Sequence, residues 1–168
     1  MSAPISQASQ TTTQGVSSVR SLLIPLNKTL MVLPNTAVAE VAAWQTPNII
    51  DTISNWLLGM VFWRGRSIPL LALEPLIGGQ TASGGAHART IICNTLNGNP
   101  QLPFIAIVAQ GIPRLQELTA ERMEQIIEDA PSASRQPASR LLLDGQPALI
   151  PDLDQLESML LKMGVTVA

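Results

Sequence analysis

The stretch NWLLGMVFWRGRSIPLLAL, residues 55–73, is the densest apolar segment of the 168-residue chain, and two arginines flanking a glycine interrupt it. Side chains of an extended strand alternate between two faces. For residues 56–63 these faces are Trp56, Leu58, Met60 and Phe62 on one side, and Leu57, Gly59, Val61 and Trp63 on the other. Both are apolar, whereas a strand of a small antiparallel barrel normally has one polar face. The stretch therefore predicts a strand buried on both sides, either between its own barrel and a second barrel or partner, or within one large core.

The Arg64-Gly65-Arg66 tripeptide predicts a hairpin turn between residues 56–63 and 67–73. Gly65 provides the backbone freedom that the turn requires. Gly59, inside the first strand, either relieves packing or allows a bulge. Arg64 is expected at the rim of an apolar surface, with its stem packed and its guanidinium group available to a partner, while Arg66 is interpreted as solvated.

The remaining pattern is one of short apolar runs separated by 13 prolines and 11 glycines, which favours strands over long helices. We expect strands at residues 19–26, 29–33, 90–95, 103–109, 112–118, 140–143 and 148–150, with an extended or helical piece at 38–44. Residues 119–129 are predicted to be helical. A C-terminal amphipathic helix is expected to begin after an Asp152 N-cap and to end at Gly164.

These strands form two clusters on either side of a glycine-rich loop at residues 78–89. The pattern predicts a mostly β protein made of two small barrels with a C-terminal helix. Residues 1–18, rich in Ser, Thr and Gln, are predicted to be a disordered tail without the features of a secretory signal. Residues 19–163 are then a single domain with two barrel subdomains. No apolar run reaches the roughly 20 residues that a membrane-spanning helix needs.

Charge and cysteine content exclude several classes of function. The net charge is −2 and the isoelectric point is near 5.3, with the basic residues scattered along the chain, which argues against nucleic-acid binding. A single cysteine, Cys93, excludes an internal disulfide and fits the reducing cytoplasm. The glycines of residues 79–84 have the spacing of a phosphate-binding loop, but Gly85 and Ala86 stand where Lys and Ser/Thr are required. No cofactor is therefore expected.

Residues suited to catalysis are scarce. His87 and Cys93 lie six positions apart, but His87 is in a Gly/Ala/Ser loop and Cys93 is expected to be a small core residue of a strand. A zinc site would need carboxylates for most of its ligands, which disfavours it. Glu74 follows the apolar stretch and is interpreted as a cap for the next turn. Binding or scaffolding is thus favoured over two alternatives, a small enzyme that uses Cys93 and His87 and a barrel that binds an apolar ligand in its interior.

The apolar stretch resembles the signature of CheW-like domains: an apolar strand containing Gly, then Arg-Gly, Ile-Pro and an aliphatic strand. Further similarities follow in the family's order. Residues 38–41 (Val-Ala-Glu-Val) resemble its short Val-x-Glu-Val/Ile element. The segments 22–33, 104–121 and 141–156 are similar to its opening strand pair, its later strand, and its closing hairpin and helix. The resemblance covers about residues 19–163.

This resemblance implies two five-stranded SH3-like barrels that share an apolar seam, and a cytoplasmic adaptor without catalysis or cofactor. Such adaptors join the cytoplasmic tips of methyl-accepting chemoreceptors to the regulatory domain of a CheA-type histidine kinase. They join receptor arrays at the membrane without inserting into it. Carried over by position, the receptor- or kinase-binding residues are Val38, Glu40, Val41, Gly59, Arg64 and Gly65 in the first barrel, and Val108, Ile112 and Leu115 on the second barrel's side of the groove.

Departures from the family pattern narrow the resemblance. Ala72 stands where the family usually carries Asp, and Trp63 stands where it usually has a smaller aliphatic residue. These features resemble a divergent accessory member, of the ChpC type found in chemosensory systems that control type IV pili and twitching motility.

Overall fold

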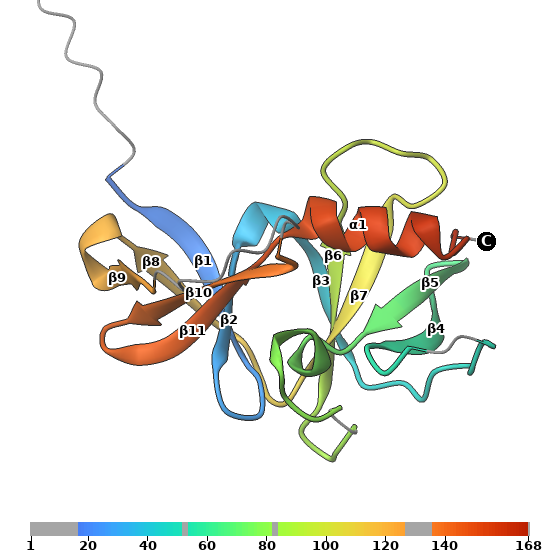
Figure 1. The fold of residues 1–168 in the computed structure, drawn as a ribbon, viewed down its shortest axis with the longest axis horizontal. Coiled ribbons are helices and arrows are strands. Elements are labelled where there is room, and N and C mark those ends of the chain that lie inside the picture. The colour runs from blue at the N-terminus through green and yellow to red at the C-terminus, as the bar shows by residue number, and fades with distance from the viewer. Residues whose placement is uncertain (1–16, 52–53, 82–83, 127–135, 168) are drawn as a thin grey trace, which may run out of the picture.

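The computed structural model describes residues 17–51, 54–81, 84–126 and 136–167. This part of the chain forms two mostly antiparallel β-sheets and one α-helix (Figure 1). The first, called sheet A, has the strand order β8 (Arg114–Leu118), β1 (Val19–Pro25), β2 (Leu30–Pro34), β11 (Gln146–Pro151), β10 (Ala138–Leu143) and β9 (Met123–Gln125). The second, called sheet B, has the order β3 (Val38–Ala43), β6 (Arg89–Asn94), β7 (Phe104–Ala109), β5 (Arg66–Leu71) and β4 (Leu57–Trp63).

Three 3₁₀ turns and one helix complete the described part: η1 (Asn35–Ala37), η2 (Glu74–Ile77), η3 (Ala120–Arg122) and α1 (Leu153–Lys162). Within each sheet one pair of strands is parallel, β2 with β11 and β5 with β7. The mostly β fold with two small barrels and a C-terminal helix is therefore as predicted. Sheet A has six strands because the three-residue β9 adds to its edge.

The division of strands between the sheets differs from the prediction. The glycine-rich loop at residues 78–89 does not separate the two barrels, since β3–β5 before it and β6–β7 after it share sheet B. Sheet A combines the first two strands with the last four. The strands of sheet B are thus consecutive in the sequence. They stand between the first two and the last four strands of sheet A along the chain. Sequence order misled here because the parallel pairing of β2 with β11 joins strands from opposite ends of the chain.

The helix expected at residues 119–129 is wrong for the part that the structure describes. Residues 120–122 form η3, and β9 pairs antiparallel with β10, with Met123 opposite Leu143. Helix propensity is a weak local preference that such pairing overrides. Residues 127–129 lie outside the described residues.

The β4–β5 hairpin forms where the Arg-Gly-Arg tripeptide predicted it. Arg64 and Gly65 have φ angles of 47° and 80°, between the paired residues Trp63 and Arg66. Positive φ at both central residues is the geometry of a type I′ turn, which matches the right-handed twist of paired strands. Gly65 meets this requirement without strain, whereas Arg64 adopts a conformation that is uncommon for a residue with a side chain.

Three apolar clusters fill the molecule. One occupies the interior of sheet B and includes Val61 and Trp63, and another fills the interior of sheet A. The largest, called the seam, lies between the sheets and contains Leu57 of β4, Leu33 of β2 and the apolar side of α1. The prediction that the apolar strand is buried on both sides is wrong. Leu57, Gly59, Val61 and Trp63, which form one face of β4, are buried, whereas on the other face Leu58 and Met60 are half-buried and Phe62 is 63% exposed.

In the view of Figure 1, helix α1 runs across the upper part of the half formed by sheet B, at the level of β3, β6 and β7, and most of sheet A lies to its left. Its Asp152 cap accepts a hydrogen bond of 3.0 Å from the Gln155 backbone amide, and Gly164 ends it with a φ of 74°. Both features were expected from the sequence. Leu153, Leu156 and Leu160 point into the seam. Among the described residues, the structure has no helix with the length and apolar character needed to cross a membrane.

Candidate partner-binding surface

Three side chains meet where the two edges of sheet B come together. Glu40 belongs to β3 and Trp63 to β4, the strands at opposite edges of this sheet. Oε2 of Glu40 accepts a hydrogen bond of 3.1 Å from Nε1 of Trp63 and forms a 2.8 Å ion pair with Nη2 of Arg64. The Arg64 guanidinium carbon lies 4.9 Å from the centre of the Trp63 ring. We call Glu40, Trp63 and Arg64 the clasp, because together they join β3 to β4.

The members of the clasp differ in exposure. Trp63 is 9% exposed, and its ring also makes an edge contact with Phe104 at 4.9 Å between centroids. The side chains of Glu40 and Arg64 are 36% and 69% exposed. An exposed ion pair contributes at most about 1 kcal/mol, so the clasp is stabilised mainly by the indole hydrogen bond and by packing. Arg64 is thus held in place by its neighbours while most of its surface faces solvent.

Replacement of Glu40 separates the contribution of the ion pair with Arg64 from that of the hydrogen bond with the Trp63 indole. Glu40→Gln keeps an acceptor for the Trp63 indole and is expected to lower the free energy of unfolding by less than about 1 kcal/mol. Glu40→Ala leaves a largely buried N–H without its acceptor and is expected to cost about 1–3 kcal/mol. Urea denaturation monitored by tryptophan fluorescence measures both. Equal effects of the two substitutions would contradict this assignment.

The other residues expected from the first barrel lie on β3 and at the hairpin tip. Val41 is 40% exposed, while Val38 is half-buried and packs against the seam. Gly65 is exposed beside Arg64. The β3 strand is at the edge of its sheet, so the side chains of this surface lie next to a row of backbone groups on that edge.

Ile112 and Leu115 are exposed by 66% and 51%. Leu115 lies on β8 of sheet A, paired with Leu22, whereas Ile112 lies in the connection that leaves sheet B after β7. Arg89 of β6 pairs with Ala43 on one side and Ala109 on the other. The connection carrying Ile112 therefore leaves sheet B at the end where β3 finishes.

Two predicted site residues are not available to a partner. Val108 is 0% exposed and lies on β7 of sheet B, so its expected place on the second barrel's side of a groove is wrong. The central strand of a covered sheet has no solvent-facing side, which explains its burial. Gly59 is also buried, and a Cβ built there would lie 2.2 Å from the carbonyl oxygen of Asn48. The lack of a side chain at Gly59 allows the backbone at Asn48 to pack closely against β4.

Sequence reasoning noted Trp63 only as a departure from the family pattern. The structure shows that Trp63 contacts both members of the Glu40–Arg64 ion pair, through its indole N–H and its ring face. A signal was present, because a buried indole N–H needs an acceptor and Glu40 is a carboxylate in the short element already singled out.

The alternative functions find no support in this geometry. Cys93 is completely buried in β6, and burial raises the pKa of its thiol to about 12, so the thiolate that a nucleophile requires is disfavoured. His87 is exposed in a loop. Side chains of the two barrel clusters occupy the barrel interiors, where an apolar ligand was considered. No group of three or more His, Cys, Asp or Glu residues suited to a metal occurs among the described residues.

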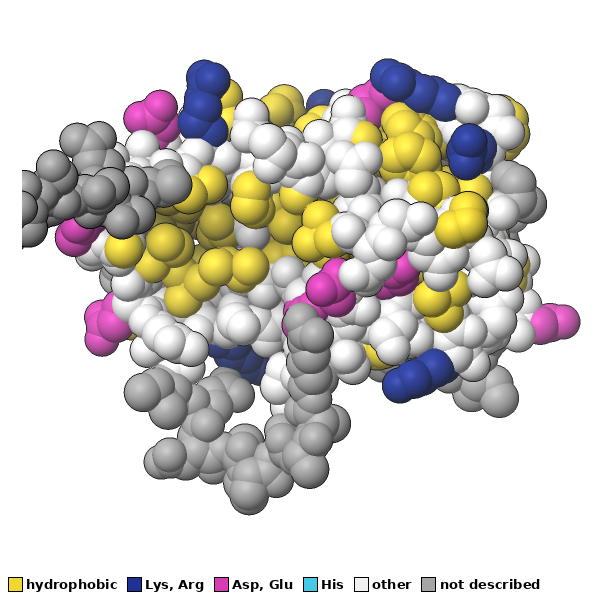
Figure 2. All heavy atoms as spheres, turned by 90° about the horizontal axis from the view of Figure 1, so that it is seen from above, with side chains coloured by type: hydrophobic (Ala, Val, Ile, Leu, Met, Phe, Trp, Pro, Cys, Tyr) yellow, Lys and Arg dark blue, Asp and Glu magenta, His cyan; other side chains and the backbone are white. Residues whose placement is uncertain are grey.

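Figure 2 shows that hydrophobic side chains gather on the face seen from above, mainly over the half formed by sheet A, with most charged side chains toward its margins. Exposed apolar residues occur in both halves. Leu96 and Ile150, at 64% and 37% exposure, border a hollow of about 460 Å³ beside the start of α1. Apolar surface of this kind is typical of proteins that bind other proteins.

Comparisons with known proteins agree with this architecture. A family model described as CheW-like domain matches residues 20–159. The scaffolding protein TtCheW from Thermoanaerobacter tengcongensis has a similar structure, with a TM-score of 0.63, 16% sequence identity, and coverage of 84% of this chain and 88% of that one. No curated protein sequence gives a significant match. With most of its length matched by the family model, the chain belongs to the CheW-like family.

Proposed function

We propose that this protein is a non-catalytic adaptor that couples chemoreceptors to a CheA-type histidine kinase in chemosensory signalling. Membership of the CheW-like family supports the adaptor role, and a solved structure with a similar fold is that of a scaffolding protein. The observation that carries the receptor assignment is the clasp, which holds an exposed arginine at a barrel rim beside an exposed apolar position, Val41.

The clasp suits recognition of a helical receptor tip. Glu40 and the Trp63 ring restrict the rotamers of Arg64, so less side-chain entropy is lost when its guanidinium group pairs with a partner. Apolar contacts at Val41, Ile112 and Leu115 provide most of the binding energy, and the charged pair sets orientation.

The kinase contact uses exposed apolar strand or barrel surface elsewhere on the molecule. Holding two weak partners at once makes the second contact effectively intramolecular, which raises overall affinity without new contacts. The adaptor works in the cytoplasm at receptor arrays. Within the family, Trp63 and Ala72 support an accessory role of the ChpC type, in a system that controls type IV pili and twitching motility.

Substitution at Arg64 tests the receptor assignment. Arg64→Glu reverses the charge at the rim and is expected to weaken receptor retention by about tenfold or more, equal to about 1.4 kcal/mol. Receptor and kinase captured from cell extract by the immobilised protein are quantified by mass spectrometry. Kinase retention is expected to stay at the wild-type level.

Arg66→Glu is the matched control, since it changes the same charge in the same exposed hairpin, outside the clasp. Arg64→Lys keeps the positive charge beside Glu40 and is expected to recover part of the binding. Circular dichroism and thermal unfolding show that each variant is folded. Equal receptor retention by folded wild type and Arg64→Glu would rule out the role assigned to Arg64.

A further inference from the structure

The connection between β6 and β7 arches over α1 (Figure 1). One side chain joins it to the helix, since Nδ2 of Asn97 donates hydrogen bonds to Oδ1 of Asp154 at 3.1 Å and to Oε2 of Glu157 at 2.8 Å. Glu157 is 3% exposed, and Asn97 is the donor that the described part of the structure gives its carboxylate. Loss of this donor would leave a buried carboxylate without a partner, which is costly.

Asn97 is followed by Gly98. Asparagine is thermolabile, and its side chain reacts most readily with the next backbone amide when that amide belongs to a glycine, which has no Cβ to hinder the approach. Gly98 is exposed with a φ of 64°, and a Cβ built there would meet nothing within 4 Å, so the turn has room to change shape. Among the described residues, the Gly98 amide has no hydrogen-bond partner. Its nitrogen is therefore available as a nucleophile.

The other asparagines lack this combination. None of them precedes a glycine. The amide after Asn94 belongs to Thr95 and donates to the Pro103 carbonyl oxygen at 3.0 Å, and Asn99 precedes a proline, which has no amide hydrogen. In the described part of the chain, Asn97 is thus the asparagine whose neighbouring amide is both unhindered and free of a hydrogen bond.

We propose that Asn97 is a site of spontaneous deamidation, and that the reaction weakens the attachment of the β6–β7 connection to α1. The Gly98 nitrogen forms a bond to Cγ of Asn97, the Cγ–Nδ2 bond breaks, and the Gly98 amide proton leaves with the amino group as ammonia. Water then opens the five-membered imide at either carbonyl carbon, where its hydroxyl group stays, and its hydrogen returns to the Gly98 nitrogen. The products are aspartate and isoaspartate. This proposal does not depend on the adaptor function.

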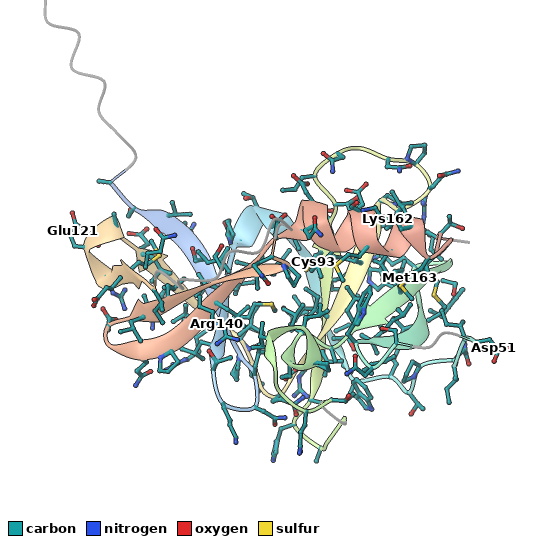
Figure 3. The ribbon with its side chains drawn as sticks, in the orientation of Figure 1. Asp51, Cys93, Glu121, Arg140, Lys162 and Met163 are labelled. Atoms are coloured by element: carbon teal, nitrogen blue, oxygen red, sulfur yellow. The ribbon has the colours of Figure 1, made fainter. Side chains whose placement is uncertain are left out.

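The product changes the sign of the contact with α1. A donor amide becomes a carboxylate that faces Asp154 and Glu157, so two hydrogen bonds are lost and like charges meet. The three side chains line a hollow of about 370 Å³ together with Lys162, which Figure 3 shows on α1 below the connection. Lys162 supplies one positive charge there, against three carboxylates after the reaction instead of two. Because Glu157 is buried, solvent screens this repulsion only weakly.

Peptide mapping by mass spectrometry follows the reaction in the full-length protein kept at mildly alkaline pH, where the amide proton is lost faster. Asn97 is expected to convert at least about tenfold faster than any other asparagine of the chain. Gly98→Ala places a Cβ beside the attacking nitrogen and is expected to slow the conversion by about tenfold or more. Circular dichroism shows that this variant is folded.

Thermal unfolding measures the consequence for the fold. Asn97→Asp imitates one product and is expected to lower the melting temperature by about 2–8 °C. Asn97→Ala removes the donor without adding charge and is expected to have a smaller effect. Glu157→Gln combined with Asn97→Asp exchanges donor and acceptor between the two positions and is expected to restore most of the loss. Asn99→Asp is the matched control, since it adds the same charge in the same connection and keeps the acceptor for the Gln101 amide.

Two kinds of result would overturn the proposal. The first is conversion of Asn97 at the rate of the other asparagines, or at an unchanged rate in folded Gly98→Ala. The second is a melting temperature of Asn97→Asp equal to that of Asn99→Asp, or no recovery when Glu157→Gln is added to Asn97→Asp.

Discussion

Gly59→Ala is expected to lower the free energy of unfolding by about 2–6 kcal/mol, a large share of the about 5–15 kcal/mol that stabilises a typical domain. The backbone of Gly59 has a φ of 136°, which a residue with a side chain adopts only with strain of about 1–3 kcal/mol. The added Cβ would also lie 2.2 Å from the carbonyl oxygen of Asn48. Such overpacking costs typically about 1–3 kcal/mol more.

The neighbouring chain has little freedom to move away. The Asn48 amide donates to the Met60 carbonyl oxygen at 2.8 Å, and the Met60 amide donates to the Asn48 carbonyl oxygen at 2.9 Å. A shift that relieves the clash would break this pair and detach the chain from the edge of β4. Gly59 is also where the pairing register of β4 with β5 shifts. The strain and the clash therefore affect the same bulge.

Urea denaturation followed by circular dichroism measures the effect. Gly85→Ala is the matched control, because a Cβ at that position meets nothing within 4 Å and the backbone has no left-handed φ. The control is expected to change the free energy of unfolding by less than about 0.5 kcal/mol. If Gly59→Ala unfolded at the same urea concentration as Gly85→Ala, the result would show that the bulge tolerates a side chain.

Leu156→Ala is expected to lower the free energy of unfolding by about 2–5 kcal/mol, the range for removal of a buried leucine side chain. Leu156 is 0% exposed on α1 and belongs to the seam between the two sheets. The cavity left behind would remove contacts to both halves at once. Refilling is limited because Leu156 packs in a dense cluster with residues from both sheets.

Thermal unfolding of this variant tests whether the molecule unfolds as one unit. Both halves lose packing, so a single transition is expected to move to lower temperature. Ser158→Ala, two positions along the same helix and half-exposed, is expected to stay within about 0.5 kcal/mol of the wild type. Two separated transitions in Leu156→Ala would contradict a shared core.

Local patterns in the sequence predicted local structure well. Arg64-Gly65 indicated the hairpin turn and Asp152 indicated the cap of α1, and the structure confirms both. These features depend on residues a few positions apart. The apolar character of residues 56–63 indicated a strand buried on two sides, but only one face of β4 is buried and Phe62 on the other face is 63% exposed. The helix predicted at residues 119–129 was wrong because β9 forms through its pairing with β10, a contact that neighbouring residues in the sequence do not reveal.

Features that depend on distant residues were not predictable in the same way. No pattern within β7 distinguishes an edge strand from a central one, so Val108 was placed on a surface although its side chain packs in the cluster inside sheet B. Glu40 and Trp63 lie 23 positions apart, and their contact arises because sheet B brings its two edges together. A cavity of about 620 Å³ beside Glu74 likewise needs segments from both halves of the chain, and Glu74 does not cap η2 as predicted, since no side-chain hydrogen bond caps that turn.

The position of sheet B between two parts of sheet A has a consequence for the order of folding. Sheet B can assemble from one uninterrupted stretch, residues 38–109, whereas sheet A must bring β1 and β2 to strands that follow that whole stretch. Closing a long flexible loop costs entropy before the contacts that compensate for it are made. If sheet B forms first, it shortens that loop to a compact body, and sheet A then closes around a scaffold that is already in place. During synthesis, β1 and β2 would leave the ribosome first and could pair with each other, but β8 follows only after the whole of sheet B, and β11, the other partner of β2, follows later still.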